Sequence, residues 1–277
     1  MRSGNESIAP REDSGREEDL QASVTSDRLQ VMMPQIEIEE TFNAFVKDFG
    51  GELIEEIFAG SGRRPNNADY FFRDRTIVAE LKCLEKNYFN DRNLGEKLTK
   101  LTNQWMKQGI LRREHIKNGM FQTDALPPKC ASEVFKIFMA PLEKAVKKAN
   151  LQIKETKKHF GLTDAKGLLI LANDGNYSQN PKLTIQMLAR LLRSTYSGID
   201  SFIYFTPNMR VTAPQLDREA RVWISGRSRE SANAVESEFL EEVARHWISF
   251  VNRITGDDPP LIKITDKNVI DDMSLVR

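Results

Sequence analysis

The segment Asn66–Tyr88, NNADYFFRDRTIVAELKCLEKNY, decides the fold. It contains two short runs that are rich in β-branched and aromatic residues, ADYFF (68–72) and TIVAELKCL (76–84), and Arg73–Arg75 lies between them. Such runs on either side of a charged turn predict a β-hairpin. Asp69 opens the first strand, and Glu80 and Lys82 stand two positions apart on the second.

This spacing brings two acids and one amine together. Side chains at i and i+2 of a strand point to the same face, so Glu80 and Lys82 project together while Leu81 enters the opposite layer. Pairing of the two strands would place Asp69 beside them. Two carboxylates, with backbone carbonyls and waters, form the oxygen site that Mg²⁺ prefers. A metal there lowers the pKa of a bound water, and the lysine can orient that water or neutralise developing charge.

A structural interpretation of the same residues remains open. Asp69 and Glu80 would then be surface charges on edge strands, with Lys82 as their ion-pair partner. Val78 and Leu84 belong to the same alternation as Glu80 and Lys82, so this face of the strand also carries apolar groups. Burying ionised groups among apolar ones costs free energy unless they are paired or bind a metal. That cost favours the metal site.

Helical and strand patterns alternate around the hairpin, which predicts an α/β protein. Glycines on both sides of GELIEEIF (51–58) favour a strand there, and GLLILAND (167–174) is an apolar run of strand length. Further strands are expected at 201–205 and 221–225. Helices are expected at 35–49, 94–113, 142–160 after Pro141, 183–192 and 232–253.

The domain organisation is simple. The acidic, polar stretch 1–30 is expected to be a disordered lead-in, and 35–255 to form a single domain. The charged, irregular stretch at about 90–140 is interpreted as a helical insertion. The segment 256–277 is expected to be a loosely packed extension.

Composition excludes several classes of protein. Hydrophobic residues make up 40% of the 277 positions, and no run approaches the roughly 18 apolar residues that span a bilayer. Two cysteines are too few for a disulfide framework, and three scattered histidines make no zinc spacing. The amino terminus lacks an apolar secretion segment. We therefore expect a cytoplasmic protein without a membrane partner. The 40 basic and 40 acidic residues cancel, so only local charge can indicate a polyanion.

Asp69 with Glu80-Leu81-Lys82 resembles the PD-(D/E)xK signature of the restriction-endonuclease-like nuclease superfamily, although Ala68 stands where that motif has a proline. The predicted order of helix, three strands, helix and strand is similar to the superfamily's shared core, with its mixed central sheet, over 35–174. The resemblance implies a Mg²⁺- or Mn²⁺-dependent nuclease in which Asp69 and Glu80 bind the metal and Lys82 assists the nucleophile. It implies nucleic acid, DNA first, as substrate, in bacterial restriction, repair or defence. Many members are homodimers.

The predicted helix 142–160 carries a strongly basic face. Its apolar residues fall within one sector of the helix, and the opposite side is rich in lysine; 141–160 holds six lysines and two glutamates. Such a face suits a phosphate backbone, although a solvated helix surface has the same composition. Some superfamily members place a glutamine on this helix near the active site, and Gln152 is the candidate here. We expect nucleic-acid contacts from Lys144, Lys147, Lys148, Gln152, Lys154 and Lys158.

Two other classes of protein remain open. The chain could be a non-catalytic nucleic-acid-binding module that keeps the nuclease-like fold, or an interaction protein whose charged segments dock a partner. Glu39, on the first predicted helix, is a candidate for a further carboxylate, but a glutamate in the first turn of a helix is also explained by the helix dipole.

Overall fold

The computed structural model describes 35–59, 66–85, 92–112, 116–117, 120–121, 126–176, 181–193, 195–212, 214, 219–228, 233–256 and 274–276. Gln35–Arg277 forms one compact unit. The predicted disordered segment 1–30 lies outside the described residues. None of the helices in the described part combines the length and the apolar character that a bilayer span requires.

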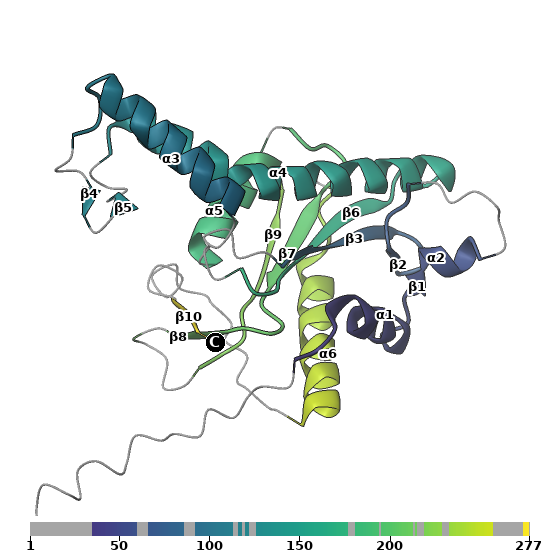
Figure 1. The fold of residues 1–277 in the computed structure, drawn as a ribbon. Coiled ribbons are helices and arrows are strands. Elements are labelled where there is room, and N and C mark those ends of the chain that lie inside the picture. Colours follow the sequence, from purple (N-terminus) through teal and green to yellow (C-terminus); the bar gives the residue numbers. More distant parts are fainter. Residues whose placement is uncertain are drawn as a thin grey trace, which may run out of the picture. The chain divides into compact units, whose positions relative to one another are not determined.

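The protein is an α/β protein with a six-stranded mixed sheet in the order β1-β2-β3-β6-β7-β9 (Figure 1). Strands β3, β6 and β7 are parallel, and the other pairings in this sheet are antiparallel. The strands are β1 (Glu52–Leu53), β2 (Tyr70–Phe72), β3 (Ile77–Leu84), β6 (Lys166–Asn173), β7 (Ser201–Phe205) and β9 (Trp223–Arg227). Two separate pairs are β4 (Ile116–Lys117) with β5 (Met120–Phe121), and β8 (Arg210–Thr212) with β10 (Ser274–Val276).

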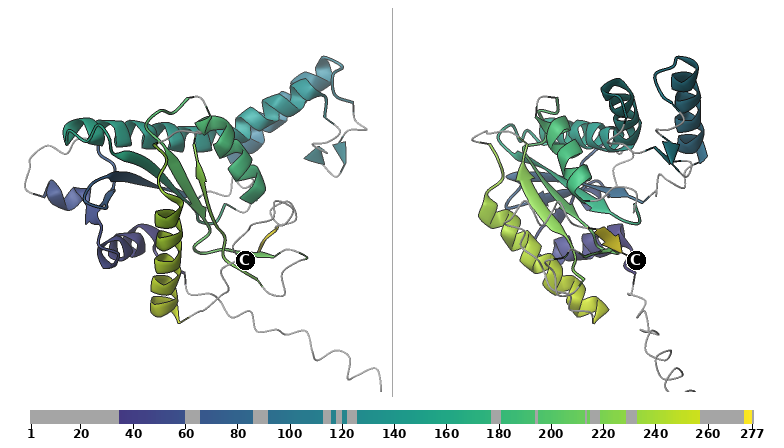
Figure 2. Two further views of the ribbon diagram at one scale, coloured as in Figure 1. Left: turned by 180° about the vertical axis from the view of Figure 1, so that it is seen from behind. Right: turned by 90° about the vertical axis from the view of Figure 1, so that its left-hand side faces the viewer.

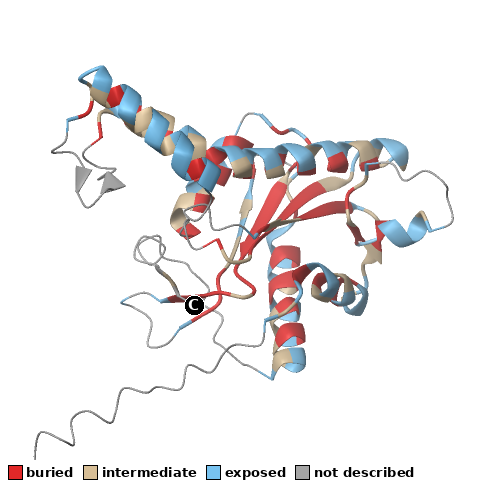
Figure 3. Ribbon diagram, in the orientation of Figure 1, coloured by how far each residue is buried: buried red, intermediate tan, exposed pale blue. Residues whose placement is uncertain are grey.

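The described residues form six helices, which are α1 (Ile38–Asp48), α2 (Ile54–Ile57), α3 (Arg92–Lys107), α4 (Pro128–His159), α5 (Pro181–Leu192) and α6 (Ser237–Thr255). Helices α4 and α5 cover one face of the sheet, and α1 and α6 cover the other (Figures 1 and 2). Alternate residues of β3 therefore enter different cores. Val78 and Leu84 pack under α4, whereas Ala79 and Leu81 face α1. Burial on both faces explains the continuous apolar runs of β6 and β7 (Figure 3).

The predicted hairpin is present. Strand β2 pairs antiparallel with β3, and Tyr70 lies opposite Ala79. All three turn residues, Arg73, Asp74 and Arg75, have positive φ, at 47°, 50° and 66°. Few non-glycine residues adopt this conformation. The ion pair between Arg75 and Glu52 at 2.6 Å helps to hold it. The expected order of helix, three strands, helix and strand occurs as α1, β1, β2, β3, α4 and β6, with α2, α3 and the β4–β5 pair as additions.

The prediction of a strand over 51–58 is mostly wrong. Only Glu52 and Leu53 are in a strand, and the chain then turns into α2. Strand β2 offers a partner over only two positions, Tyr70 and Phe71. The pattern failed because Ile54 is buried at the first position of a helix rather than within a strand.

The predicted start of the basic helix at residue 142 is also wrong. Helix α4 starts at Pro128 and runs for 32 residues, with Pro141 in its interior. The expected end of the insertion, at about residue 140, therefore falls within this helix. Proline suits the first turn of a helix, and a proline in the interior removes one backbone hydrogen bond. Burial of Cys130 and Val134 against α3 supports the first half of α4 despite that loss.

The carboxyl-terminal part differs from the prediction at three points. Residues Ser274–Val276 pair with β8, so this part of the expected loose extension belongs to a strand pair; 257–273 lies outside the described residues. The strand expected at 221–225 is shifted to Trp223–Arg227. The last helix begins at Ser237 rather than 232.

Candidate metal centre

The register of the hairpin places Asp69 opposite Glu80. The Asp69 N–H donates to the Ala79 carbonyl at 3.1 Å, which extends the antiparallel ladder by one residue beyond Tyr70. The Asp69 carboxylate Oδ2 accepts a hydrogen bond from the Leu81 N–H at 2.8 Å. The side chain of Asp69 is thereby held against β3, beside the two residues with which the sequence paired it.

Glu80 and Lys82 project to the α4 side of the sheet, as the strand alternation predicted. Glu80 is fully buried, and its Oε1 accepts a hydrogen bond from the Lys82 ammonium. The side chain of Lys82 is 16% exposed, so the ammonium connects a buried carboxylate with the solvent-accessible side of the site. The second oxygen, Oε2, is buried and receives no hydrogen bond from the described residues.

The charges at the site are unbalanced, because the buried Glu80 and the half-buried Asp69 share one ammonium, that of Lys82. Burial and the neighbouring Asp69 raise the pKa of Glu80 to about 8, against the opposing effect of Lys82. Burial also raises the pKa of Asp69, opposed by the Leu81 hydrogen bond and by Lys82. A site of this kind takes up either a proton or a cation.

The donor atoms fit a hard divalent cation. Carboxylate oxygens are the preferred ligands of Mg²⁺, which is usually held by one or two carboxylates together with waters. Asp69 and Glu80 supply such a pair. Their carboxyl groups lie within hydrogen-bond reach of each other and can share a proton in the absence of metal, and a cation would take the place of that proton beside the buried Oε2 of Glu80. Within the described ranges, no group of three or more His, Cys, Asp or Glu side chains is arranged to hold a metal. A cation here would have two carboxylate ligands, and waters or substrate would complete its coordination shell.

Helix α4 fixes the segment that leads into Asp69. The Thr156 hydroxyl accepts a hydrogen bond from the Ala68 N–H at 2.7 Å, and the Gln152 amide donates to the Asn67 carbonyl at 2.7 Å. Gln152 is buried, and its Oε1 has no partner among the described residues. Gln152 thus contacts the segment that leads into Asp69, and its role in binding nucleic acid stays a prediction. The contribution of Thr156 was missed, because a threonine within an apolar helix face carries no local signal of its partner.

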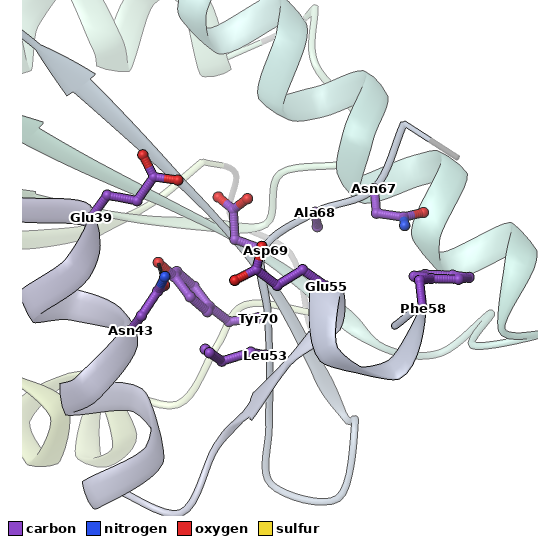
Figure 4. A pocket seen from close by; sticks show the side chains of 9 residues that line it. All are labelled: Glu39, Asn43, Leu53, Glu55, Phe58, Asn67, Ala68, Asp69 and Tyr70. Carbon is purple, nitrogen blue, oxygen red and sulfur yellow. Dashed lines mark hydrogen bonds between the residues drawn. The ribbon is translucent and has the colours of Figure 1, made fainter. Parts of the chain in front are cut away.

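A pocket opens beside Asp69. It is lined by Glu39, Asn43, Leu53, Glu55, Phe58, Asn67, Ala68, Asp69 and Tyr70. Figure 4 shows Glu39 of α1, Glu55 of α2 and Asp69 extending toward this space from three different parts of the fold. The negative charge of Glu39 adds to the raised pKa of Asp69. Glu39 thus lies near the site as well as in the first turn of α1, so the helix dipole does not fully account for its place.

The predicted lysines are exposed, but they point in different directions around α4. All five, Lys144, Lys147, Lys148, Lys154 and Lys158, are exposed. At 100° per residue, Lys148 and Lys144 lie about 40° and 80° from Gln152, on the side that carries the Asn67 contact. The other three lie about 120–160° away from Gln152. On an ideal helix, Lys144 and Lys148 thus lie nearer to Gln152 than Lys147, Lys154 and Lys158 do. Contact of any of the five with nucleic acid stays a prediction.

Comparison with protein-family models, with curated proteins and with solved structures finds no match to this chain.

Proposed function

We propose that the chain is a Mg²⁺- or Mn²⁺-dependent nuclease with a restriction-endonuclease-like core. The observation that carries the proposal is the pair of carboxylates on adjacent strands, the buried Glu80 and the half-buried Asp69, with Lys82 hydrogen-bonded to Glu80. The element order α1, β1, β2, β3, α4 and β6 supports the same superfamily. The substrate is nucleic acid, with DNA favoured by the resemblance, and restriction, repair or defence is the setting that it implies.

The side chains would divide the work as follows. Asp69 and Glu80 hold the cation, which would supply Lewis-acid polarisation of a phosphate oxygen and a more acidic bound water. Lys82 keeps Glu80 oriented through its hydrogen bond and opposes the rise in the pKa of Glu80. Because the side chain of Lys82 is partly exposed, its ammonium could also donate to the attacking water or to the phosphate oxygen on which negative charge develops. Thr156 and Gln152 keep the segment before Asp69 in place.

Cleavage assays test this proposal directly. The purified chain is incubated with Mg²⁺ or Mn²⁺ and with linear, nicked and single-stranded DNA and RNA. Wild type should cut at least one of them, and Asp69→Asn, Glu80→Gln and Lys82→Ala should each lower the rate on the order of 100-fold or more.

Matched controls separate loss of chemistry from loss of folding. Glu52→Gln removes an exposed carboxylate, and Lys47→Ala removes an exposed amine, both from surface ion pairs. These two variants should cut at the wild-type rate. If the wild type binds nucleic acid but cuts nothing with either cation, the non-catalytic binding module replaces the nuclease.

A further inference from the structure

Helix α3 is held on one side by a small apolar cluster of its own. Trp105 is buried against Cys130 and Val134 of the first half of α4. Its indole Nε1–H donates to the Glu133 carboxylate at 3.1 Å. This cluster is distinct from the two cores that flank the sheet, and α3 packs through it alongside the first half of α4 (Figure 1).

The opposite face of α3 is a stripe of amines and carboxamides. The stripe comprises the exposed residues Lys100, Asn103, Gln104, Lys107 and Gln108, which line a shallow hollow along the helix. Their spacing of i, i+3, i+4, i+7 and i+8 places them on one face. It contains no acid, and in the part of the chain that the structure describes none of these side chains makes an ion pair or hydrogen bond. The polar groups of these side chains are therefore available to solvent or to a binding partner.

This chemistry fits a DNA duplex. Lysine ammonium groups neutralise phosphates, and asparagine and glutamine carboxamides can make paired hydrogen bonds to the adenine edge in the major groove. The major groove of B-DNA is about 12 Å wide and admits an α-helix, whereas the major groove of A-form RNA is too deep and narrow for side chains to read. A helix that presents carboxamides between lysines is thus better suited to duplex DNA than to duplex RNA.

Helix α4 connects this stripe to the metal centre. The same continuous helix packs on α3 at Cys130 and contacts the Asp69 segment at Gln152. These two levels are about 33 Å apart along the helix axis at 1.5 Å per residue. One turn of B-DNA is about 34–36 Å long. A role of the stripe in DNA cleavage requires that a single duplex contact the stripe and, about one turn away, the metal centre.

We propose that the α3 stripe docks in the major groove of duplex DNA and selects the DNA that is presented to the metal centre. The proposal rests on the proposed nuclease function for its substrate, but binding can be measured without cleavage. Lys100 and Lys107 contact phosphates, and Asn103 and Gln104 read base edges.

The test uses the full chain in EDTA, so that no cleavage occurs. Fluorescence anisotropy reports binding to a labelled duplex DNA of about three helical turns, to its single strand and to the matching duplex RNA. We expect Lys100→Glu/Lys107→Glu to weaken duplex DNA binding at least tenfold and to reduce the slope of log affinity against log salt by about 2. Wild type should bind duplex RNA more weakly than duplex DNA.

A second variant separates the recognition of base edges from the electrostatic attraction to phosphates. Asn103→Ala/Gln104→Ala should keep the wild-type salt slope but lose the sequence preference that wild type shows when it selects duplexes from a random pool. The matched control Lys147→Glu/Lys154→Glu makes the same charge change on exposed lysines of α4 that point away from the site. Circular dichroism melting of each variant verifies folding.

The outcomes for the two proposals can be told apart. The proposal for the α3 stripe is overturned if Lys100→Glu/Lys107→Glu keeps the duplex affinity and salt slope of wild type. It is also overturned if the matched control loses as much affinity as this variant, or if a pulldown shows that the stripe binds a protein instead of DNA. If wild type binds duplex DNA through α3 but does not cut it with Mg²⁺ or Mn²⁺, the nuclease proposal fails and the proposal that the α3 stripe binds DNA stands. If wild type cuts DNA and the α3 variants bind and cut as wild type does, the nuclease proposal stands and the proposal that the α3 stripe binds DNA fails.

Discussion

At the scale of single residues, Glu80 has the most unusual environment in the candidate site. It is fully buried, one of its oxygens has no donor among the described residues, and its neighbours are a second acid and one amine. A side chain placed only for stability would more often be apolar or fully paired, because an unpaired buried charge costs several kcal/mol. The environment is understandable if Glu80 binds a cation.

The first prediction concerns pH. The pKa of Glu80 rises from 4.5 to about 8 on folding, so between these values the folded state keeps a proton that the unfolded state has lost. The free energy of unfolding of the metal-free protein should therefore fall as pH rises through this window, by a few kcal/mol at about 1.4 kcal/mol per pKa unit. Glu80→Gln carries no titrating group there. In EDTA its melting temperature should depend less on pH and exceed that of wild type at pH 8.

Two measurements bear on this prediction. Mg²⁺ should raise the melting temperature of wild type at pH 8 and leave Glu80→Gln nearly unchanged, since carboxylate ligands must be ionised to bind it. Glu52→Gln is the control, because a lowered pKa keeps Glu52 ionised throughout the window. Parallel pH curves for wild type and Glu80→Gln would contradict the assignment.

At the scale of elements, α4 combines three tasks. Its first half packs against α3, its buried face covers the sheet, and Thr156 and Gln152 hold the segment before Asp69. The exposed lysines add a positive surface, but only part of that surface lies on the site side. Direction around the helix, rather than the number of lysines, should decide which of them contact the substrate.

The second prediction tests this direction. Lys144→Glu/Lys148→Glu should lower nucleic-acid affinity about tenfold at low salt, because each lost phosphate contact reduces the salt slope by about 0.9 for a B-form duplex. Lys147→Glu/Lys154→Glu, with the same charge change, should bind within about twofold of wild type. Binding is measured by anisotropy in EDTA at several salt concentrations. Equal losses in the two double variants would show that net charge alone matters.

At the scale of the whole molecule, aromatic packing joins distant parts of the chain. Phe42 of α1 is fully buried, and its ring contacts residues of α1, β2, β7 and α6. The partners are Phe45, Tyr70, Phe205 and Trp247, at centroid distances of 5.1, 5.5, 6.0 and 5.0 Å. Elements that are more than 200 residues apart therefore share one core on this side of the sheet.

The third prediction follows from that shared core. Phe42→Ala should lower the free energy of unfolding by about 3–5 kcal/mol, through lost burial and the remaining cavity. The loss should appear in one cooperative urea transition, because the ring joins the first helix to the last. Leu151→Ala, at a side chain that is 49% exposed, should change stability by no more than about 0.5 kcal/mol. Separate transitions for different parts of the sheet would contradict a single core.

The amino-acid sequence by itself determined the α/β class, the β2–β3 hairpin and the common face of Glu80 and Lys82. These features depend on alternation and turns within about 20 residues, where the period of the backbone imposes the arrangement. Only the tertiary structure decided that Glu80 is fully buried, that α4 begins at Pro128, that β10 pairs with β8, and that Thr156 reaches Ala68 across 88 positions. These features depend on contacts between distant segments, which leave no period in the local sequence.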